Sequence, residues 1–110
     1  MKRFPSLKSS KEFAVVYNNA DSFANRNLVM YKSKNSLDKN RIGISVSKKV
    51  GNSVVRHRLT RLIREIFRLN SPYFEGYDIV VVIRVAAANC GYRELENSYI
   101  KLSKLHKDKI

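Results

Sequence analysis

Hydrophobic residues recur every three or four positions in three segments of the chain, which is the spacing of a helix with one buried face. We predict helices over residues 10–19, about 52–69 and about 92–107. The first follows Ser9 and carries Glu12 three residues later, which is the spacing of a capping box. The third places four residues on one face: Leu95, Tyr99, Leu102 and His106.

Four other segments have the patterns of strands. A short strand is predicted at residues 22–24, and longer ones at 28–34 and 41–47, where successive side chains would point to opposite faces. Residues 78–85 form an apolar, β-branched run that is typical of a strand buried on both faces. Because a helix separates this run from the strand before it, we expect it to lie parallel to a preceding strand.

The strand predicted at residues 41–47 has two unlike faces. Ile42, Ile44 and Val46 suit a hydrophobic core. The other face carries only Arg41, Gly43, Ser45 and Ser47. This small polar face is either exposed to solvent or the floor of a groove walled by Tyr31 and the first helix.

The first helix would present three apolar side chains on one side, namely Phe13, Val16 and Tyr17. They either dock the helix on the core, or an aromatic edge among them lines a groove for unpaired bases, which stack on aromatic rings. Lys48 and Lys49 would lie at the end of that groove. The sequence leaves both interpretations open.

The helix predicted at residues 52–69 is apolar on one face and cationic elsewhere. Its apolar stripe consists of Val55, Leu59, Leu62, Ile63 and Ile66. Opposite lie His57, Arg61, Arg64 and Arg68, and the stripe is flanked by Arg56 and Arg58. From Arg41 to Arg68 the chain carries eight Lys or Arg and one acid, Glu65. Since guanidinium groups bind phosphate bidentately and stack on bases, we favour a nucleic-acid face over a solvated surface.

Composition supports one small globular domain with a polyanionic partner. The chain has 110 residues, 44% of them hydrophobic, and we expect a single nucleic-acid-binding domain over residues 1–110 with a flexible lead-in at 1–8. A net charge of +13 and a pI near 10.2 favour nucleic acid over an anionic membrane. The single cysteine excludes an intrachain disulfide. The sequence shows neither the apolar region of a secretory signal nor an apolar run long enough to span a membrane. A cytoplasmic protein is therefore expected.

Catalytic constellations are missing from the sequence. The two histidines, His57 and His106, are far apart, and no metal-ligand spacing, acid/base pair or phosphate-cradling loop is found. Cys90 has no activating partner at hand, so an inert thiol is expected. These observations favour a binding module over a self-sufficient enzyme.

Residues 45–58, SVSKKVGNSVVRHR, and the following Arg61-Leu62-Ile63-Arg64 resemble the signature of the bacterial ribonuclease P protein component. That family carries an S-x-K-K-x-G-x-A-V-x-R-N-R-x-K-R-x-x-R pattern. The resemblance extends upstream to Phe13, Tyr17, Ala24-Asn25-Arg26, Val29 and Tyr31. His57 departs from the family's asparagine, and either keeps its hydrogen bond with altered geometry or gains a charge at mildly acid pH. Thr60 stands where the family often has a basic residue, which implies that this chain makes one phosphate contact fewer.

The resemblance implies an α/β (α+β) two-layer sandwich, ordered α-β-β-β-α-β-α, with a left-handed β-α-β crossover. General rules alone would favour a right-handed one. The implied function is that of the protein subunit of an endoribonuclease, ribonuclease P. By this resemblance, the single RNA-binding domain would bind the catalytic RNA and the single-stranded 5′ leader of precursor tRNA, and magnesium ions at the RNA active site would support the hydrolysis that forms the mature tRNA 5′ end. By the same resemblance, the protein itself would supply no catalytic residue, metal site or cofactor.

The resemblance also assigns residues to two binding surfaces. The catalytic RNA would be bound by Lys48, Lys49, Arg56, His57, Arg58, Arg61, Arg64 and Arg68. The leader would lie in a cleft formed by Phe13, Tyr17, Val29, Tyr31, Ser45 and Lys48. The alternative is a structural, ribosome-associated RNA-binding protein, whose affinity would ignore a single-stranded 5′ extension. No membrane or small-molecule partner is expected.

Overall fold

The computed structural model describes residues 6–7, 9–70 and 75–108. Its elements, in chain order, are α1 Ser10–Asn19, β1 Asp21–Ala24, β2 Leu28–Lys34, β3 Arg41–Val46, α2 Ser53–Leu69, β4 Tyr77–Ile83, a 3-10 turn at Val85–Ala87 and α3 Tyr92–Asp108. The predicted α-β-β-β-α-β-α order is confirmed. No helix within the described ranges is long and apolar enough to cross a bilayer.

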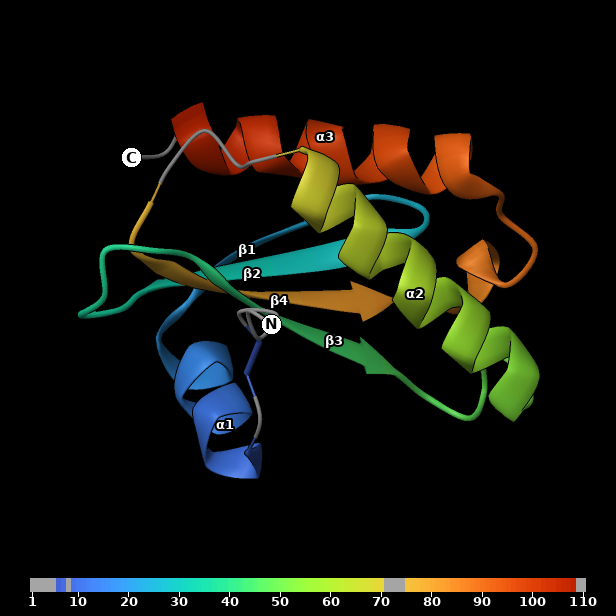
Figure 1. Cartoon of the computed structure of the whole chain (residues 1–110), viewed down its shortest axis with the longest axis horizontal. Helices are drawn as coiled ribbons and strands as arrows, with labels where there is room; N and C mark the ends of the chain where they lie inside the picture. The colour runs from blue at the N-terminus through green and yellow to red at the C-terminus, as the bar shows by residue number, and fades with distance from the viewer. Residues whose placement is uncertain (1–5, 8, 71–74, 109–110) are drawn as a thin grey trace.

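The four strands form one mixed sheet in the order β1-β2-β4-β3. β1 with β2 and β2 with β4 are antiparallel, whereas β3 and β4 are parallel, as predicted for a strand that follows a helical crossover. In Figure 1, α2 passes in front of the sheet and β4 lies above β3, with both arrows pointing to the right. This arrangement is a left-handed β3-α2-β4 crossover, as the family resemblance implied.

One face of the sheet supports the main core. Leu28, Met30 and Val81 are fully buried there against α2 and α3. The helices bury Leu59, Ile63 and Ile66 from α2 and Leu95, Tyr99 and Leu102 from α3. These helices and the sheet form the predicted two-layer sandwich.

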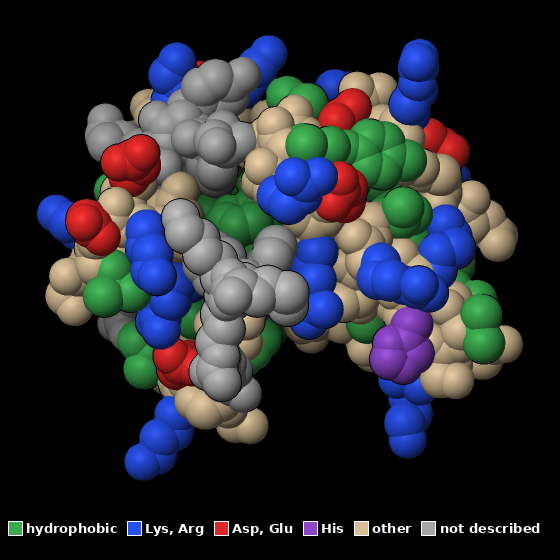
Figure 2. Space-filling model, in the orientation of Figure 1, with side chains coloured by type: hydrophobic (Ala, Val, Ile, Leu, Met, Phe, Trp, Pro, Cys, Tyr) green, Lys and Arg blue, Asp and Glu red, His purple; other side chains and the backbone are tan. Residues whose placement is uncertain are grey.

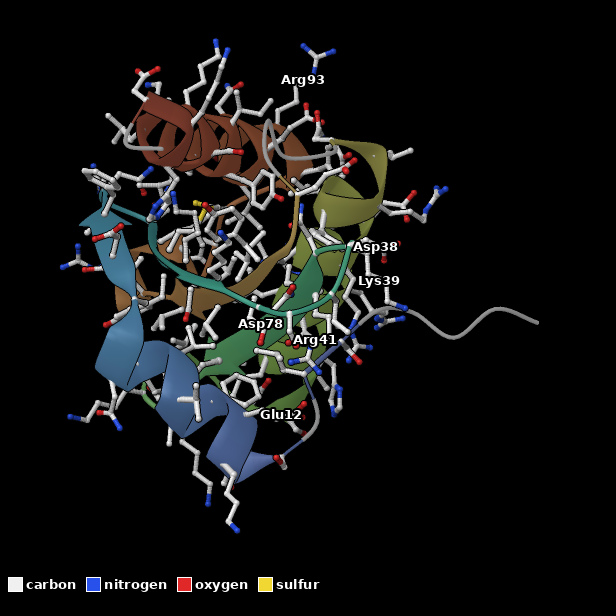
Figure 3. The ribbon with its side chains drawn as sticks, turned by 90° about the vertical axis from the view of Figure 1, so that its left-hand side faces the viewer. Glu12, Asp38, Lys39, Arg41, Asp78 and Arg93 are labelled. Atoms are coloured by element: carbon white, nitrogen blue, oxygen red, sulfur yellow. The ribbon has the colours of Figure 1, made fainter. Side chains whose placement is uncertain are left out.

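Helix α1 packs on the other face of the sheet. Val16 is fully buried against Val80 of β4, and Phe13 and Tyr31 are half-buried beside them. Figure 3 shows α1 and α2 on opposite sides of the sheet. The predicted capping box is present: Glu12 N donates to Ser9 Oγ at 3.2 Å, and Ser9 N donates to Glu12 Oε1 at 3.1 Å.

Strand β4 ends at Ile83, two residues earlier than predicted. Ile83 pairs with Leu28, the first residue of β2, and with Val46, the last residue of β3. Both neighbouring strands therefore end their pairing with β4 at this point, although the Arg84 N–H still donates to the carbonyl of Asn27, just before β2, at 2.9 Å. Val85 instead begins the 3-10 turn and is 57% exposed.

The predicted flexible lead-in at residues 1–8 lies mostly outside the described residues and stays a prediction, but Ser6 and Leu7 have defined contacts with β3. Leu7 N donates to the Ile42 carbonyl at 2.9 Å, and Ser6 bridges to Ile42 in parallel fashion. The Leu7 side chain is buried with Val16 and Val80. The buried Leu7 side chain and the hydrogen bond to the edge of β3 hold residues 6 and 7 against the sheet. The charge and composition of the sequence did not indicate these contacts.

Candidate nucleic-acid interface

Helix α2 presents a cationic face because its apolar residues are used for the core. Asn52 caps the helix, since its Oδ1 accepts from Val55 N at 3.0 Å. Phe67 joins the buried residues of the predicted stripe, whereas Val55 and Leu62 are only half-buried. The opposite side exposes His57, Arg61, Arg64 and Arg68, as predicted. Figure 2 shows Lys and Arg side chains gathered over α2.

Lys48 and Lys49 extend this cationic face toward the sheet. Both are exposed in the turn that joins β3 to α2, and the Val50 N–H closes the turn on the Ser47 carbonyl at 3.1 Å. Because the turn follows β3 directly, it brings two ammonium groups to the end of the strand that carries Ser45. The positively charged surface of α2 therefore continues through Lys48 and Lys49 to the end of β3.

Arg68 is paired with an acid of its own helix. Its Nε and Nη2 donate to the two carboxylate oxygens of Glu65, with the Nε bond at 3.1 Å. The pairing lowers the pKa of the Glu65 carboxyl and raises that of the Arg68 guanidinium. Both side chains are exposed, so the pair is weak and a phosphate can compete for Arg68.

Helix α1 leaves one end of its sheet face uncovered. Ser45, Val82 and Val29 lie side by side across β3, β4 and β2, and each is half-buried. The neighbouring row contains Gly43 and Val80, which are buried beneath α1. We call the row formed by Ser45, Val82 and Val29 the open strip. Its Ser45 belongs to the small polar face of β3 that the sequence analysis left as either solvent-exposed surface or groove floor.

An aromatic row, formed by Phe13, Tyr17 and Tyr31, borders the open strip. The Tyr17 and Tyr31 rings meet edge to face with centroids 5.0 Å apart, and the Phe13 and Tyr17 centroids are 6.4 Å apart. Tyr17 is 41% exposed, whereas Val16 beside it is fully buried. Val16 and the half-buried Phe13 therefore dock α1 on the sheet, and Tyr17 retains exposed ring surface on which a base could stack.

The sequence model of the Ribonuclease P family matches residues 1–107. The chain belongs to the ribonuclease P protein family. It is 56% identical to the ribonuclease P protein component of Lachnoclostridium phytofermentans, over 93% of this chain and 89% of that protein. It is 48% identical to that of Clostridium kluyveri, over 89% and 90% of the two chains.

Solved structures of ribonuclease P proteins have the same fold. The Staphylococcus aureus protein superposes with a TM-score of 0.87 at 36% identity, over 96% of this chain and 97% of that one. The Thermotoga maritima protein gives a TM-score of 0.82 at 28% identity, over 90% and 96% of the two chains. Family membership makes this chain a protein subunit of a tRNA-processing ribonucleoprotein, with RNA as its partner.

Within the family signature, the two arginines around His57 have unequal freedom. Arg58 is half-buried, and its Nη1 and Nη2 donate to the carbonyls of Cys90 and Ala88, each at 3.0 Å. It therefore ties α2 to the loop before α3 and keeps only part of its donor set for phosphate. Arg56 is also half-buried, and its Nε has no hydrogen-bond partner among the described residues.

The sequence analysis left two exposed arginines unassigned, and one of them, Arg84, lies at the end of β4 beside the open strip. Arg84 is extended, so it continues the alternation of Val80 and Val82 on the same sheet face, and its Nη1 donates to the Asn25 carbonyl at 2.8 Å. Arg26 is exposed in the turn between β1 and β2. The period-two spacing of residues 80, 82 and 84 is the sequence signal that could have identified Arg84.

The Cys90 thiol is buried, and burial raises its pKa, with a further contribution from Glu94. A thiol that stays protonated at neutral pH is a poor nucleophile, in agreement with the predicted inert role. No group of three or more His, Cys, Asp or Glu that could hold a metal ion occurs among residues 6–7, 9–70 and 75–108.

Proposed function

We propose that this ribonuclease P protein binds the catalytic RNA through the cationic face of α2 and holds the single-stranded 5′ leader of precursor tRNA on the open strip. The observation that carries this proposal is the position of the strip. It lies between the aromatic row on one side and the cationic turn before α2 on the other.

The catalytic-RNA face consists of Lys48, Lys49, Arg56, His57, Arg58, Arg61, Arg64 and Arg68. Exposed guanidinium groups on a helix bind phosphates without reading sequence, and this suits a folded RNA whose backbone is its accessible surface. Arg61 should contribute more than Arg58 and Arg68, because both of those arginines already have protein partners. His57 adds an exposed imidazole in place of the family's asparagine.

The leader surface consists of Phe13, Tyr17, Val29, Tyr31, Ser45 and Lys48. Bases stack on aromatic rings with about 1–3 kcal/mol each and with little dependence on base identity. Ser45 and Val29 offer a shallow floor, and Lys48 places a positive charge for a phosphate at the end of β3. Tolerance of sequence is what a subunit acting on many precursors requires.

Catalysis is proposed to belong to the RNA, with magnesium ions at its active site. Residues of this chain then act by binding and orienting: α2 fixes the protein on the RNA, and the open strip directs the leader away from the cleavage site. No cofactor of the protein itself is proposed.

The test is 5′-end cleavage of precursor tRNA by a bacterial catalytic RNA at low magnesium, with and without this protein. Stimulation by the protein, and no cleavage by the protein alone, are expected. A second experiment measures the affinity of the reconstituted complex for precursor tRNAs whose 5′ leaders increase in length. Affinity that ignores leader length is the result expected of a structural, ribosome-associated RNA-binding protein.

A further inference from the structure

We propose that Arg41 is a positioning residue that attaches the N-terminal end of α1 to the sheet and thereby places the aromatic row along the open strip. Nothing in the sequence analysis assigned Arg41 a role beyond the polar face of β3. The inference rests on the proposed function, because it concerns the surface assigned to the leader.

The Arg41 guanidinium joins α1 to two strands. Its Nε and Nη2 donate to the two carboxylate oxygens of Asp78 on β4, at 2.8 and 2.7 Å. Its Nη1 donates to Glu12 Oε2 on α1 at 2.7 Å. Figure 3 shows Arg41 close to both acids. Asp78 is buried and also accepts from Asn35 Nδ2 at 2.9 Å, so the strand end of this connection is fixed.

Glu12 has two roles in this connection. Its Oε1 accepts from Ser9 N as part of the capping box, and its Oε2 accepts from Arg41. One side chain therefore determines both where α1 begins and where it meets the sheet. Isolated helices of about ten residues are marginal in water, so α1 depends on such contacts for its orientation.

The attachment continues directly into the aromatic row. Phe13 follows Glu12 and packs on Gly43, where a Cβ would lie 2.6 Å from Phe13 Cζ. Tyr17, one turn later, meets the Tyr31 ring. A tilt of α1 at its Glu12 end therefore moves the rings that border the open strip.

Loss of the Arg41–Glu12 ion pair should affect the position of α1 much more than the stability of the fold. The Arg41–Glu12 pair is partly exposed, with side chains 25% and 31% accessible, and such pairs add little to global stability. The buried contact of Val16 remains when the pair is lost. Loss of the pair should therefore loosen the orientation of α1 without unfolding the protein.

Glu12→Gln is the sharpest variant, because glutamine also serves at this position of a capping box but carries no charge for Arg41. Arg41→Lys is the second variant, since a single ammonium cannot reproduce a fork that spans two carboxylates. Asp38→Asn is the matched control. It makes the same charge change as Glu12→Gln at an exposed site in the loop between β2 and β3.

Each variant is reconstituted with the catalytic RNA, and affinity is measured for precursor tRNA with a leader and for leaderless tRNA. Glu12→Gln and Arg41→Lys should weaken binding of the leader-bearing substrate about three- to tenfold and leave leaderless tRNA unchanged. Asp38→Asn should change neither. Equal losses on both substrates, wild-type behaviour of Glu12→Gln, or an equal effect of Asp38→Asn would overturn the proposal.

A measurement without RNA separates this inference from the proposed function. Contacts between the Tyr17 and Tyr31 ring protons, observed by NMR in the free protein, should weaken in Glu12→Gln and persist in Asp38→Asn. Unchanged contacts in Glu12→Gln would refute the role of Arg41 even if the wild type prefers long leaders. A wild type that ignores the leader, with the ring contacts weakened as expected, would instead refute the leader assignment.

Discussion

Two substitutions close together in α2 should separate folding from RNA binding. Ile63 of α2 is fully buried in the core that α2 and α3 form with the sheet, whereas Arg61 is exposed on the other side of the helix. Truncation of a fully buried isoleucine to alanine costs about 2–5 kcal/mol, which is a large part of the roughly 5–15 kcal/mol by which small domains are stable. At about 4 °C for each kcal/mol, Ile63→Ala should lower Tm by about 8–20 °C. Leu62→Ala should cost less, because Leu62 is only half-buried.

Arg61→Ala should leave folding unchanged within about 0.5 kcal/mol, because its side chain has no part in the core. RNA binding should weaken, and the slope of log K against log salt should fall by about 0.7–0.9, the value for one lost phosphate contact. Lys104→Ala provides the matched control, since it removes an exposed positive charge from α3, outside the proposed RNA face.

Thermal denaturation and RNA binding across a salt series test both substitutions together. The reasoning is refuted if Arg61→Ala lowers Tm as far as Ile63→Ala does, because the two faces of α2 would then be wrongly assigned. It is also refuted if Lys104→Ala changes the salt slope as much as Arg61→Ala, because charge alone would then explain binding.

Other substitutions test the remaining parts of the site and the core. Tyr31→Ala should weaken binding of long-leader precursors more than that of leaderless tRNA, and equal effects would make Tyr31 only a core residue. Arg84→Ala should weaken leader-dependent binding and leave Tm unchanged; a salt slope equal to wild type would exclude a phosphate contact. His57→Asn should retain cleavage stimulation at low magnesium, and a loss would show that the imidazole has its own role. Tyr99→Phe should stabilise the protein by about 1–3 kcal/mol in urea denaturation, since the buried Tyr99 hydroxyl has no hydrogen-bond partner among the described residues. Burial raises the pKa of Tyr99, so wild-type stability should be full below pH about 10 and fall above it, whereas Tyr99→Phe should lose less over the same range.

Periodicity predicted the elements well because it reports local burial. The spacing in α2 identified Leu59, Ile63 and Ile66 as core residues, and all are fully buried. The spacing in α3 likewise identified His106, which is fully buried with its Nε2 2.8 Å from the Met30 carbonyl. That partner lies on β2, however, and no local pattern could have named it.

Contacts between residues that are far apart in the chain could not be predicted from the sequence. Arg58 resembled the other arginines of α2, yet its donors reach the Cys90 and Ala88 carbonyls, which the chain path brings beside α2. Leu7 appeared to belong to a polar lead-in, yet β3 had an open edge for it. The left-handed crossover came only from the family resemblance, because general chirality rules favour the opposite hand.

The two proposed binding surfaces depend on different parts of the fold, and this has a functional consequence. The α2 face stands on the main core, where Ile63 and Ile66 fix the helix. The position of the aromatic row depends on α1, which carries Phe13 and Tyr17. This short helix is held to the sheet by Val16, Phe13 and the hydrogen bond from Arg41 to Glu12. Changes at α1 can therefore alter how the leader is held without disturbing the contact with the catalytic RNA. Leader preference and holoenzyme assembly should respond to separate sets of substitutions, even though a single turn at Lys48 joins the two surfaces.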